Sequence, residues 1–290
     1  MTQQPSNCEL SFNRSDIERC FGFPSKKLTA VNFLFTFFLA VLLTGLCYGI
    51  LLPFSGRGIA MIDMFFHGGT MHRSTLPYYT VFLTCWSLAI LWVKSRKLKT
   101  QRKAFTVKIL PDDPNFVLSP RTASEILNRI YTAVDQPSCF ALFDRIDLAL
   151  GNLKNLGSVD AVSECLTNQA ANDEACLNSS HTVLNGFIWA IPVLGFIGTV
   201  IGLSTAVGGF GAVVAKGANL EELKQALGGV TGGLAVAFET TLIALVLALL
   251  VQLYAKFVQA QEEQFLDECA DYCNRNIIAR MKDINLAEEA

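Results

Sequence analysis

Four long apolar segments alternate with polar ones along this chain of 290 residues. They lie at 28–56, 74–93, 175–215 and 225–255. The first three contain no Lys, Arg, Asp or Glu, and the fourth contains only Glu239. A helix needs about 20 apolar residues to cross the hydrocarbon core of a bilayer. The pattern therefore predicts an all-α membrane protein with four transmembrane helices, and a mean hydropathy of +0.38 agrees with it.

Amphipathic patterns predict further helices outside the membrane. Apolar residues recur at helical spacing in 119–135 and 138–156, after a proline-containing break at 111–114. Beyond Lys256 the helical spacing continues, with Glu262 and nearby carboxylates on the predicted wet side. We therefore expect a cytoplasmic helical region and cytoplasmic extensions of the last two transmembrane helices.

The turn between the last two transmembrane helices has a signal of its own. Asn219 and Glu222 are spaced as in a capping box, in which each residue bonds the backbone of the other. Within 208–227, this spacing predicts a short interfacial helix.

The distribution of Lys and Arg predicts the orientation of the chain, because cytoplasmic connections carry an excess of both. Lys26 and Lys27 precede the first helix, and the segment 94–103 after the second is strongly basic. The connections 55–76 and 208–227 carry few cations. Both termini are therefore expected in the cytoplasm, and the two short connections outside.

These patterns divide the chain into five parts. The predicted parts are a cytoplasmic N-terminal segment at 1–27, a transmembrane hairpin at 28–93, a cytoplasmic helical region at 94–180, two transmembrane helices at 181–256 and a cytoplasmic helical tail at 257–290. For the N-terminal segment the sequence leaves two alternatives open, a loosely ordered tail and an interfacial segment. The 55–76 connection is rich in glycine, which predicts an irregular outer loop.

Composition excludes several classes of function. The net charge is −2, and topology accounts for the basic run, so no nucleic-acid partner is expected. The predicted cytoplasmic region is too short and too discontinuous in pattern for a separate enzyme domain. It contains no Gly-rich phosphate loop, nucleophile elbow or zinc spacing, so we do not expect an enzyme. Cys269 and Cys273 lack further ligands at metal spacing, so no metal is expected. The isolated histidines, including His181, are left out of the predicted site.

The last two apolar segments contain residues that simple anchoring in lipid does not require. Glycines allow transmembrane helices to approach one another closely, and a proline can kink a helix and free a carbonyl group. The residues assigned to helix packing and shape are Pro192, Gly195, Gly198, Gly202, Gly232 and Gly233. Glu239 is ionisable within a membrane segment, which makes it a functional candidate.

Two of these motifs carry a resemblance to a known family. Pro192, Gly195, the Gly198-Thr199-Val200 run and Gly202 resemble the Pro-x-x-Gly-x-x-Gly-Thr-Val-x-Gly signature of the MotA/TolQ/ExbB proton-channel family. The run from Ala237 to Leu245 is similar to the family's Ala-Leu-x-x-Thr-Ala-x-Gly-Leu segment. The likeness covers roughly residues 180–260.

The resemblance implies an ion-driven motor stator in the bacterial inner membrane. In such complexes five copies of the subunit surround a pore lined by their last two helices. Two copies of a single-helix partner similar to ExbD, TolR or MotB sit in the pore and carry an intramembrane Asp. The complex needs no cofactor, and it translocates H⁺ or possibly Na⁺. Ion flow then drives mechanical work in a distant process.

Hydroxyl groups suit the lining of such a pore, because they can solvate a carboxylate in either protonation state. Thr199, Thr241 and Thr240 are therefore predicted to line the ion pathway. The alternative is that each hydroxyl only bonds a carbonyl of its own helix. In the TolQ/ExbB branch the acidic residue usually stands at the position of Val236, so Glu239 is displaced by about one turn. It relays protons or bonds a neighbouring helix, and both alternatives stay open.

A second hypothesis belongs to a different class of function. In it, the glycine-rich helices oligomerise and anchor the cytoplasmic parts, without conducting ions. A substrate transporter is a third hypothesis, but it would need a pocket and usually repeated halves, neither of which the sequence indicates. Trp92, Trp189 and Tyr254 are interpreted as anchors at the membrane surface.

Overall fold

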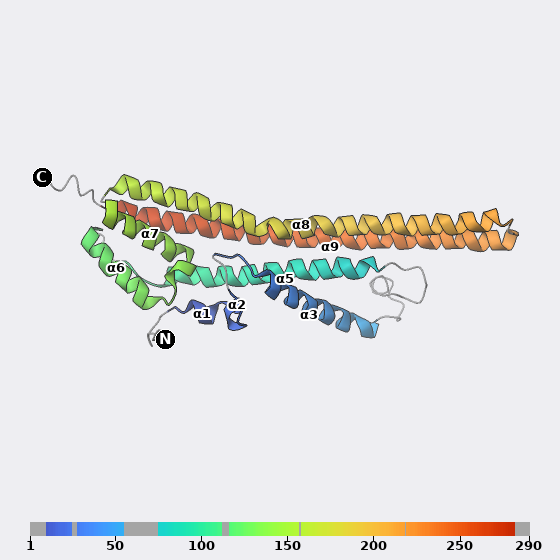
Figure 1. Cartoon of the computed structure of the whole chain (residues 1–290), viewed down its shortest axis with the longest axis horizontal. Coiled ribbons are helices and arrows are strands. Elements are labelled where there is room, and N and C mark those ends of the chain that lie inside the picture. The colour runs from blue at the N-terminus through green and yellow to red at the C-terminus, as the bar shows by residue number, and fades with distance from the viewer. Residues whose placement is uncertain are drawn as a thin grey trace. The chain divides into compact units, whose positions relative to one another are not determined.

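The computed structural model describes most of the chain. The described residues are 10–24, 28–54, 75–111, 116–156, 158–217 and 219–281. They form two compact units (Figure 1). We call Thr36–Leu91 with Val183–Lys256 the apolar unit, and Met1–Phe35 with Trp92–Thr182 and Phe257–Ala290 the polar unit. The predicted outer loop lies mostly outside the described residues.

Within the described residues, four helices are long and apolar enough to cross a membrane, which confirms the predicted fold class. They are α3 (Phe33–Leu51), α5 (Leu76–Arg102), α8 (Val159–Ala215) and α9 (Leu220–Asn276). A 3₁₀ turn, Leu52–Phe54, follows α3. At 1.5 Å per residue, the 57 residues of α8 extend ~85 Å. That length is nearly three times the thickness of a bilayer core, so much of the helix lies outside the membrane.

In the apolar unit, α8 and α9 run side by side and α5 packs against them (Figure 1). Ile191 of α8 and Ala244 and Ala248 of α9 form a small buried cluster, against which Leu83 of α5 packs. Trp86 joins α5 to α3, because its indole N–H donates to the Thr36 hydroxyl at 3.3 Å. The apolar faces that remain exposed suit helices that meet lipid or other membrane helices.

The polar unit has an ordinary hydrophobic core, built around α7 (Ala141–Leu156). Phe140, Phe143, Ile146 and Leu150 are fully buried there at the helical spacing that the sequence predicts. The pair α6 (Pro120–Ala133) and α7 forms the predicted helical region. A capping box begins α6, in which the hydroxyls of Ser119 and Thr122 bond each other's backbone N–H. The described part of the unit also contains 3₁₀ turns at Lys103–Thr106, Pro137–Cys139 and Ile278–Arg280.

The N-terminal segment, described from residue 10 to residue 24, packs into this core through Leu10 and Phe12. It forms two short helices, α1 (Phe12–Ser15) and α2 (Ile17–Cys20). The Phe12 side chain is buried, and its backbone N–H donates to the Asp135 carboxylate at 2.8 Å. Glu18 is also buried and pairs with Lys97 at 2.6 Å. The loosely ordered tail is therefore wrong for these residues, because a buried aromatic ring and an ion pair hold them.

The predicted short helix in the turn 208–227 is also wrong. α8 continues to Ala215, and α9 begins at Leu220 and runs on without a break. The capping box itself is present: the Asn219 N–H donates to the Glu222 carboxylate at 3.1 Å, and the Glu222 N–H donates to the Asn219 side chain at 3.0 Å. It starts the long helix, because the glycines at 228 and 229 do not interrupt the helical hydrogen bonds.

Candidate functional site at the contact between α8 and α9

Glycines bring the backbones of α8 and α9 together over about three turns. A Cβ atom at Gly195 would lie 2.6 Å from the Cβ of Ala244, and one at Gly198 would lie 2.7 Å from the Thr240 hydroxyl. Real Cβ atoms do not approach other atoms so closely, so a larger residue would push the helices apart. A Cβ at Gly233 would lie 2.7 Å from the Cβ of Ala206, and one at Gly202 would lie 3.1 Å from the Cβ of Ala237, which is tight but less so. The contact therefore depends on small residues from both helices.

Pro192 and Gly232 differ from these four glycines. α8 stays helical through Pro192, whose missing N–H leaves the Ile188 carbonyl without its usual helical donor. Gly232 has open space around it within the chain, since a Cβ there would meet no atom within 4 Å. The structure thus brings four of the predicted packing glycines together and leaves Gly232 on a different face of α9.

The predicted threonines lie beside the same contact. Thr241 donates its hydroxyl hydrogen across the interface to the Gly195 carbonyl at 3.0 Å. Thr240 is buried against Gly198 and donates to the Ala237 carbonyl of its own helix at 2.9 Å. Thr199 is partly exposed and donates to the Phe196 carbonyl at 2.6 Å. Each hydroxyl uses its hydrogen within the chain, and its oxygen retains lone pairs that can accept from water or a protonated acid.

Glu239 lies at the edge of this contact and is partly exposed. The next residue, Thr240, faces α8, and successive residues of a helix are about 100° apart around its axis. Glu239 therefore projects from α9 about 100° away from the direction in which Thr240 meets α8.

A second polar group, in the polar unit, was not predicted as a site. Lys94, His181 and Glu262 are all buried. The Lys94 ammonium donates to the Glu262 carboxylate at 3.1 Å and to the Ser180 hydroxyl at 2.8 Å. A His181 ring nitrogen lies 2.6 Å from the other Glu262 oxygen. We call Lys94, Ser180, His181 and Glu262 the buried charge cluster.

The buried charge cluster corrects the prediction that Glu262 lies on the wet side of α9. Sequence spacing cannot reveal that partners from α5 and α8 cover a carboxylate. Burial by itself raises the pKa of Glu262, but the hydrogen bond with His181 and the positive charge of Lys94 outweigh it. The pKa therefore lies below its ordinary value, which keeps Glu262 ionised. The cluster ties three helices together with matched charges.

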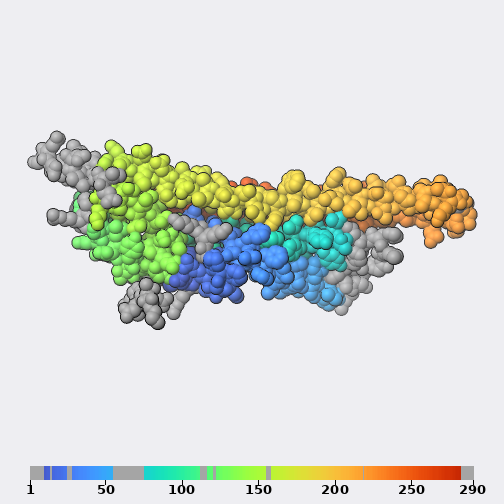
Figure 2. All heavy atoms as spheres, viewed as in Figure 1, coloured from blue at the N-terminus to red at the C-terminus, as the bar shows by residue number. Residues whose placement is uncertain are grey.

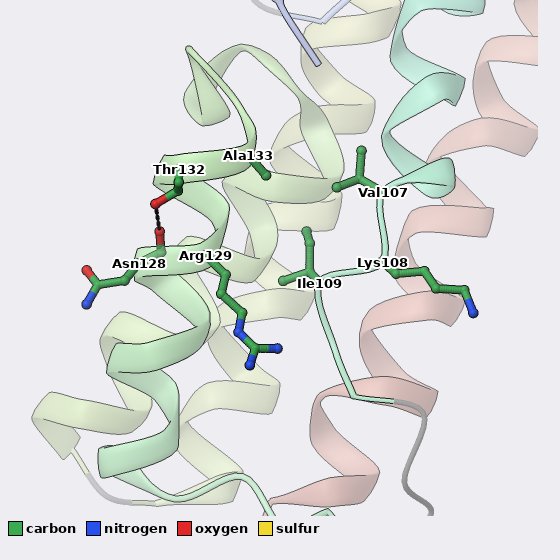
Figure 3. Close-up of a pocket in the computed structure, with 7 residues that line it drawn as sticks. All are labelled: Val107, Lys108, Ile109, Asn128, Arg129, Thr132 and Ala133. Atoms are coloured by element: carbon green, nitrogen blue, oxygen red, sulfur yellow. Dashed lines mark hydrogen bonds between the residues drawn. The ribbon is translucent and has the colours of Figure 1, made fainter. Parts of the chain in front are cut away.

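Two other features of the polar unit are candidates for a reactive or binding site: a pair of buried cysteines and a pocket beside α6. Burial raises the pKa of the Cys269 thiol to about 12 and that of Cys273 to about 11, so neither is a reactive thiolate. An open pocket lies between α6 and the extended residues after α5 (Figure 3). Arg129 reaches across it, whereas Lys108 points away (Figure 3). Polar groups do not converge in this pocket as they do in a substrate site.

A comparison with models of known protein families gives a match over the two long helices. A model described as the MotA/TolQ/ExbB proton channel family matches residues 141–270. The matched segment is similar to that family and spans somewhat less than half of the chain. The match confirms the resemblance drawn from the glycine and threonine motifs. No curated protein and no solved structure was found to match the chain.

The MotA/TolQ/ExbB segment contains α7, all of α8 and most of α9. It therefore includes both sides of the glycine contact and all three predicted threonines. It also includes Ser180, His181 and Glu262 of the buried charge cluster, but not Lys94. The family is one of membrane channels, so the multi-pass membrane location follows from the same match and the four apolar helices.

Proposed function

We propose that this protein is the pore-forming subunit of an ion-driven motor complex. The observation that carries the proposal is that the segment matched by the family model contains the close α8–α9 contact. At this contact Thr199, Thr240 and Thr241 lie at about the same height along the two helices, which we call the threonine level. The match to a channel family and the presence of hydroxyl groups within otherwise apolar helices together favour ion conduction. The chain is proposed to conduct ions and not to catalyse a reaction.

The proposed assembly is a homopentamer around a partner helix. Its support is the apolar surface that α8 leaves exposed in the single chain; the exposed atoms of this helix are seen in Figure 2, which is coloured by residue number. Phe196, Val200, Leu203 and Val207 are exposed there, at fractions between 46% and 64%. Neighbouring copies on one side and a single-helix partner on the other would cover such faces. The partner is proposed to resemble ExbD, TolR or MotB, to be present in two copies and to carry an intramembrane Asp.

In the proposed mechanism, the partner's Asp takes up and releases the ion beside the threonine level. Oxygen lone pairs of Thr199, Thr240 and Thr241 accept from the protonated acid or from water that solvates its anion. H⁺ is the proposed ion and Na⁺ the alternative. Glu239, at the edge of the level, is proposed to relay the proton or to bond the adjacent copy. The Lys- and Arg-rich C-terminal part of α5 supports an orientation with both termini cytoplasmic, and the proposed location is the bacterial inner membrane.

The scaffold hypothesis has one specific observation in its favour. Thr199 and Thr240 each spend their hydroxyl hydrogen on a carbonyl of their own helix, as threonines without a pore role do. In that hypothesis the α8–α9 contact serves only to hold the oligomer together.

Ion flux through the reconstituted complex separates the two hypotheses. We expect Thr241→Val, in liposomes with the partner, to lower the flux by roughly tenfold through loss of one solvating hydroxyl, about 1.4 kcal/mol. Thr199→Val should lower it in the same direction. Thr44→Val is the matched control for Thr199→Val, because Thr44 of α3 likewise bonds a carbonyl of its own helix, that of Ala40. Flux is measured with H⁺ and Na⁺ varied separately.

Two outcomes decide the matter. If Thr199→Val and Thr241→Val conduct like the wild type while the complex stays assembled, the scaffold hypothesis replaces the motor. If Glu239→Gln changes neither flux nor assembly, Glu239 is only a packing residue, and the threonine pathway is unaffected by that result.

A further inference from the structure

Beyond its apolar segment, helix α5 carries cationic side chains on two different faces, one buried and one exposed. Lys94 and Lys97 point inward and are buried. Each has a carboxylate partner, because Lys94 pairs with Glu262 at 3.1 Å and Lys97 pairs with Glu18 at 2.6 Å. The positive charge on this inner face is therefore neutralised within the polar unit.

The outer face of α5 carries cations of a different kind. Arg96 and Lys99 of α5 are exposed, as is Lys103, the first residue of the 3₁₀ turn that follows. Within the described ranges none of the three has a carboxylate partner. With Trp92 they form a stripe at helical spacing, since residues 92, 96, 99 and 103 lie within about 60° of one another around the helix. The Arg96 guanidinium lies over the Trp92 ring, 5.8 Å from its centroid. This face thus offers positive charge that nothing in the described chain neutralises.

The position of Trp92 sets the depth of the stripe. Its side chain is 46% exposed and it stands next to Val93, the last residue of the uncharged segment. Tryptophan favours the boundary between hydrocarbon and headgroups. Along the helix, Arg96 lies ~6 Å and Lys99 ~10 Å past Trp92, whereas Lys103 lies ~16 Å past it. The headgroup layer is only about 5–7 Å thick, so long side chains from Arg96 and Lys99 reach the phosphates and Lys103 does not.

We propose that Trp92, Arg96 and Lys99 form a binding site for the headgroup of an anionic phospholipid, of the phosphatidylglycerol class. The guanidinium and the ammonium bind the phosphate, and the indole ring packs on the glycerol and upper acyl chains. The exposed Trp92 ring beside the cations favours a lipid as the ligand over an acidic protein. A phospholipid has apolar chains directly next to its anionic headgroup, and the indole ring can pack on them. The proposal depends on membrane residence and not on ion conduction.

Lipid counting on the intact complex tests the proposal. The full chain in detergent is titrated with phosphatidylglycerol, and bound lipids are counted by native mass spectrometry, with phosphatidylcholine as the uncharged reference. We expect phosphatidylglycerol to bind more tightly than phosphatidylcholine. Arg96→Gln and Lys99→Gln should each weaken it roughly fivefold, the usual contribution of one cation near an anionic headgroup. Lys103→Gln removes the same charge one turn farther away and should leave binding unchanged.

Three results would overturn the site. One is equal binding of the two lipids, and another is an equal loss in all three variants, which would indicate only general attraction. The third is dissociation of the oligomer in Arg96→Gln, which would assign the stripe to contact between copies of the chain. Glycerol phosphate, added as a soluble competitor, should not displace the lipid, because it lacks the acyl chains that Trp92 contacts. Ion flux plays no part in these outcomes, so the proposed function stands or falls separately.

Discussion

At the scale of single residues, the structure distinguishes glycines that share one sequence signature. Gly195, Gly198, Gly202 and Gly233 each face a side chain of the opposing helix, whereas Gly232 faces open space within the chain. Gly232 and Gly233 point about 100° apart around α9, but the sequence does not show which of the two directions meets α8. The difference gives a matched pair for testing whether close approach, and not helix flexibility, is the reason for these glycines.

We expect Gly198→Ala to destabilise the chain by about 1–3 kcal/mol, because its Cβ would lie 2.7 Å from the Thr240 hydroxyl. Gly232→Ala is the control, and it should be neutral or stabilise the helix by up to ~1 kcal/mol. Thermal unfolding of the detergent-solubilised chain, followed by helical circular dichroism, measures both. Equal losses in the two variants would contradict the packing explanation.

At the scale of elements, buried charges hold helices that the hydrophobic pattern treats as independent. The buried charge cluster joins α5, α8 and α9 through Lys94, His181 and Glu262. Lys97 similarly joins α5 to the N-terminal segment through Glu18. Removing one member of such a group leaves an uncompensated charge in the protein interior, which is far more costly than the loss of a surface ion pair.

Glu262→Gln should therefore destabilise the chain by about 3–5 kcal/mol at neutral pH. The pKa of Glu262 is lower in the folded chain than in the unfolded one, so its contribution is present above the unfolded pKa and is lost as the pH falls through the folded pKa. The difference in the free energy of unfolding between the wild type and Glu262→Gln should accordingly become smaller below about pH 4. Unfolding at a series of pH values measures it, with Glu263→Gln on the exposed face as the control. A difference in the free energy of unfolding that does not depend on pH would show that Glu262 stabilises the chain through the shape of its side chain and not through its charge.

At the scale of the whole molecule, the exposed apolar faces of α8 and α9 require something beyond this single chain. Lipid suits the outward faces of α3, whose Phe38 and Leu42 are more than 60% exposed. The Gly- and Thr-rich faces of the family segment are suited instead to protein, because small residues favour helix contacts. The motor hypothesis supplies that protein as further copies and a partner helix.

Co-expression with a neighbouring single-helix protein, followed by native mass measurement and imaging, tests the assembly. The motor hypothesis expects five copies of this chain around two copies of a partner that bears an intramembrane acid. Replacing that acid by its amide should stop ion flux without releasing the partner. A closed, partner-free bundle with no central space would contradict the motor and leave the scaffold.

Much of this architecture is determined by local sequence. The four apolar segments, the amphipathic periods that became α6 and α7, and the Asn219–Glu222 cap each depend on neighbours within a few turns of chain. The Gly-Thr signature at Gly198 and Thr199 was likewise sufficient to indicate the family. Such features are readable because hydrophobic period and capping chemistry act over short distances.

Only tertiary structure decided which polar residues are buried and which glycines meet a partner. Glu262 has the same sequence surroundings as a solvated carboxylate, and it is buried because Lys94 and His181 come from helices far away in the chain. Thr241 bonds the Gly195 carbonyl for the same kind of reason. Local periodicity assigns a residue to one side of its own helix, but the partner that meets that side is set by how distant helices pack.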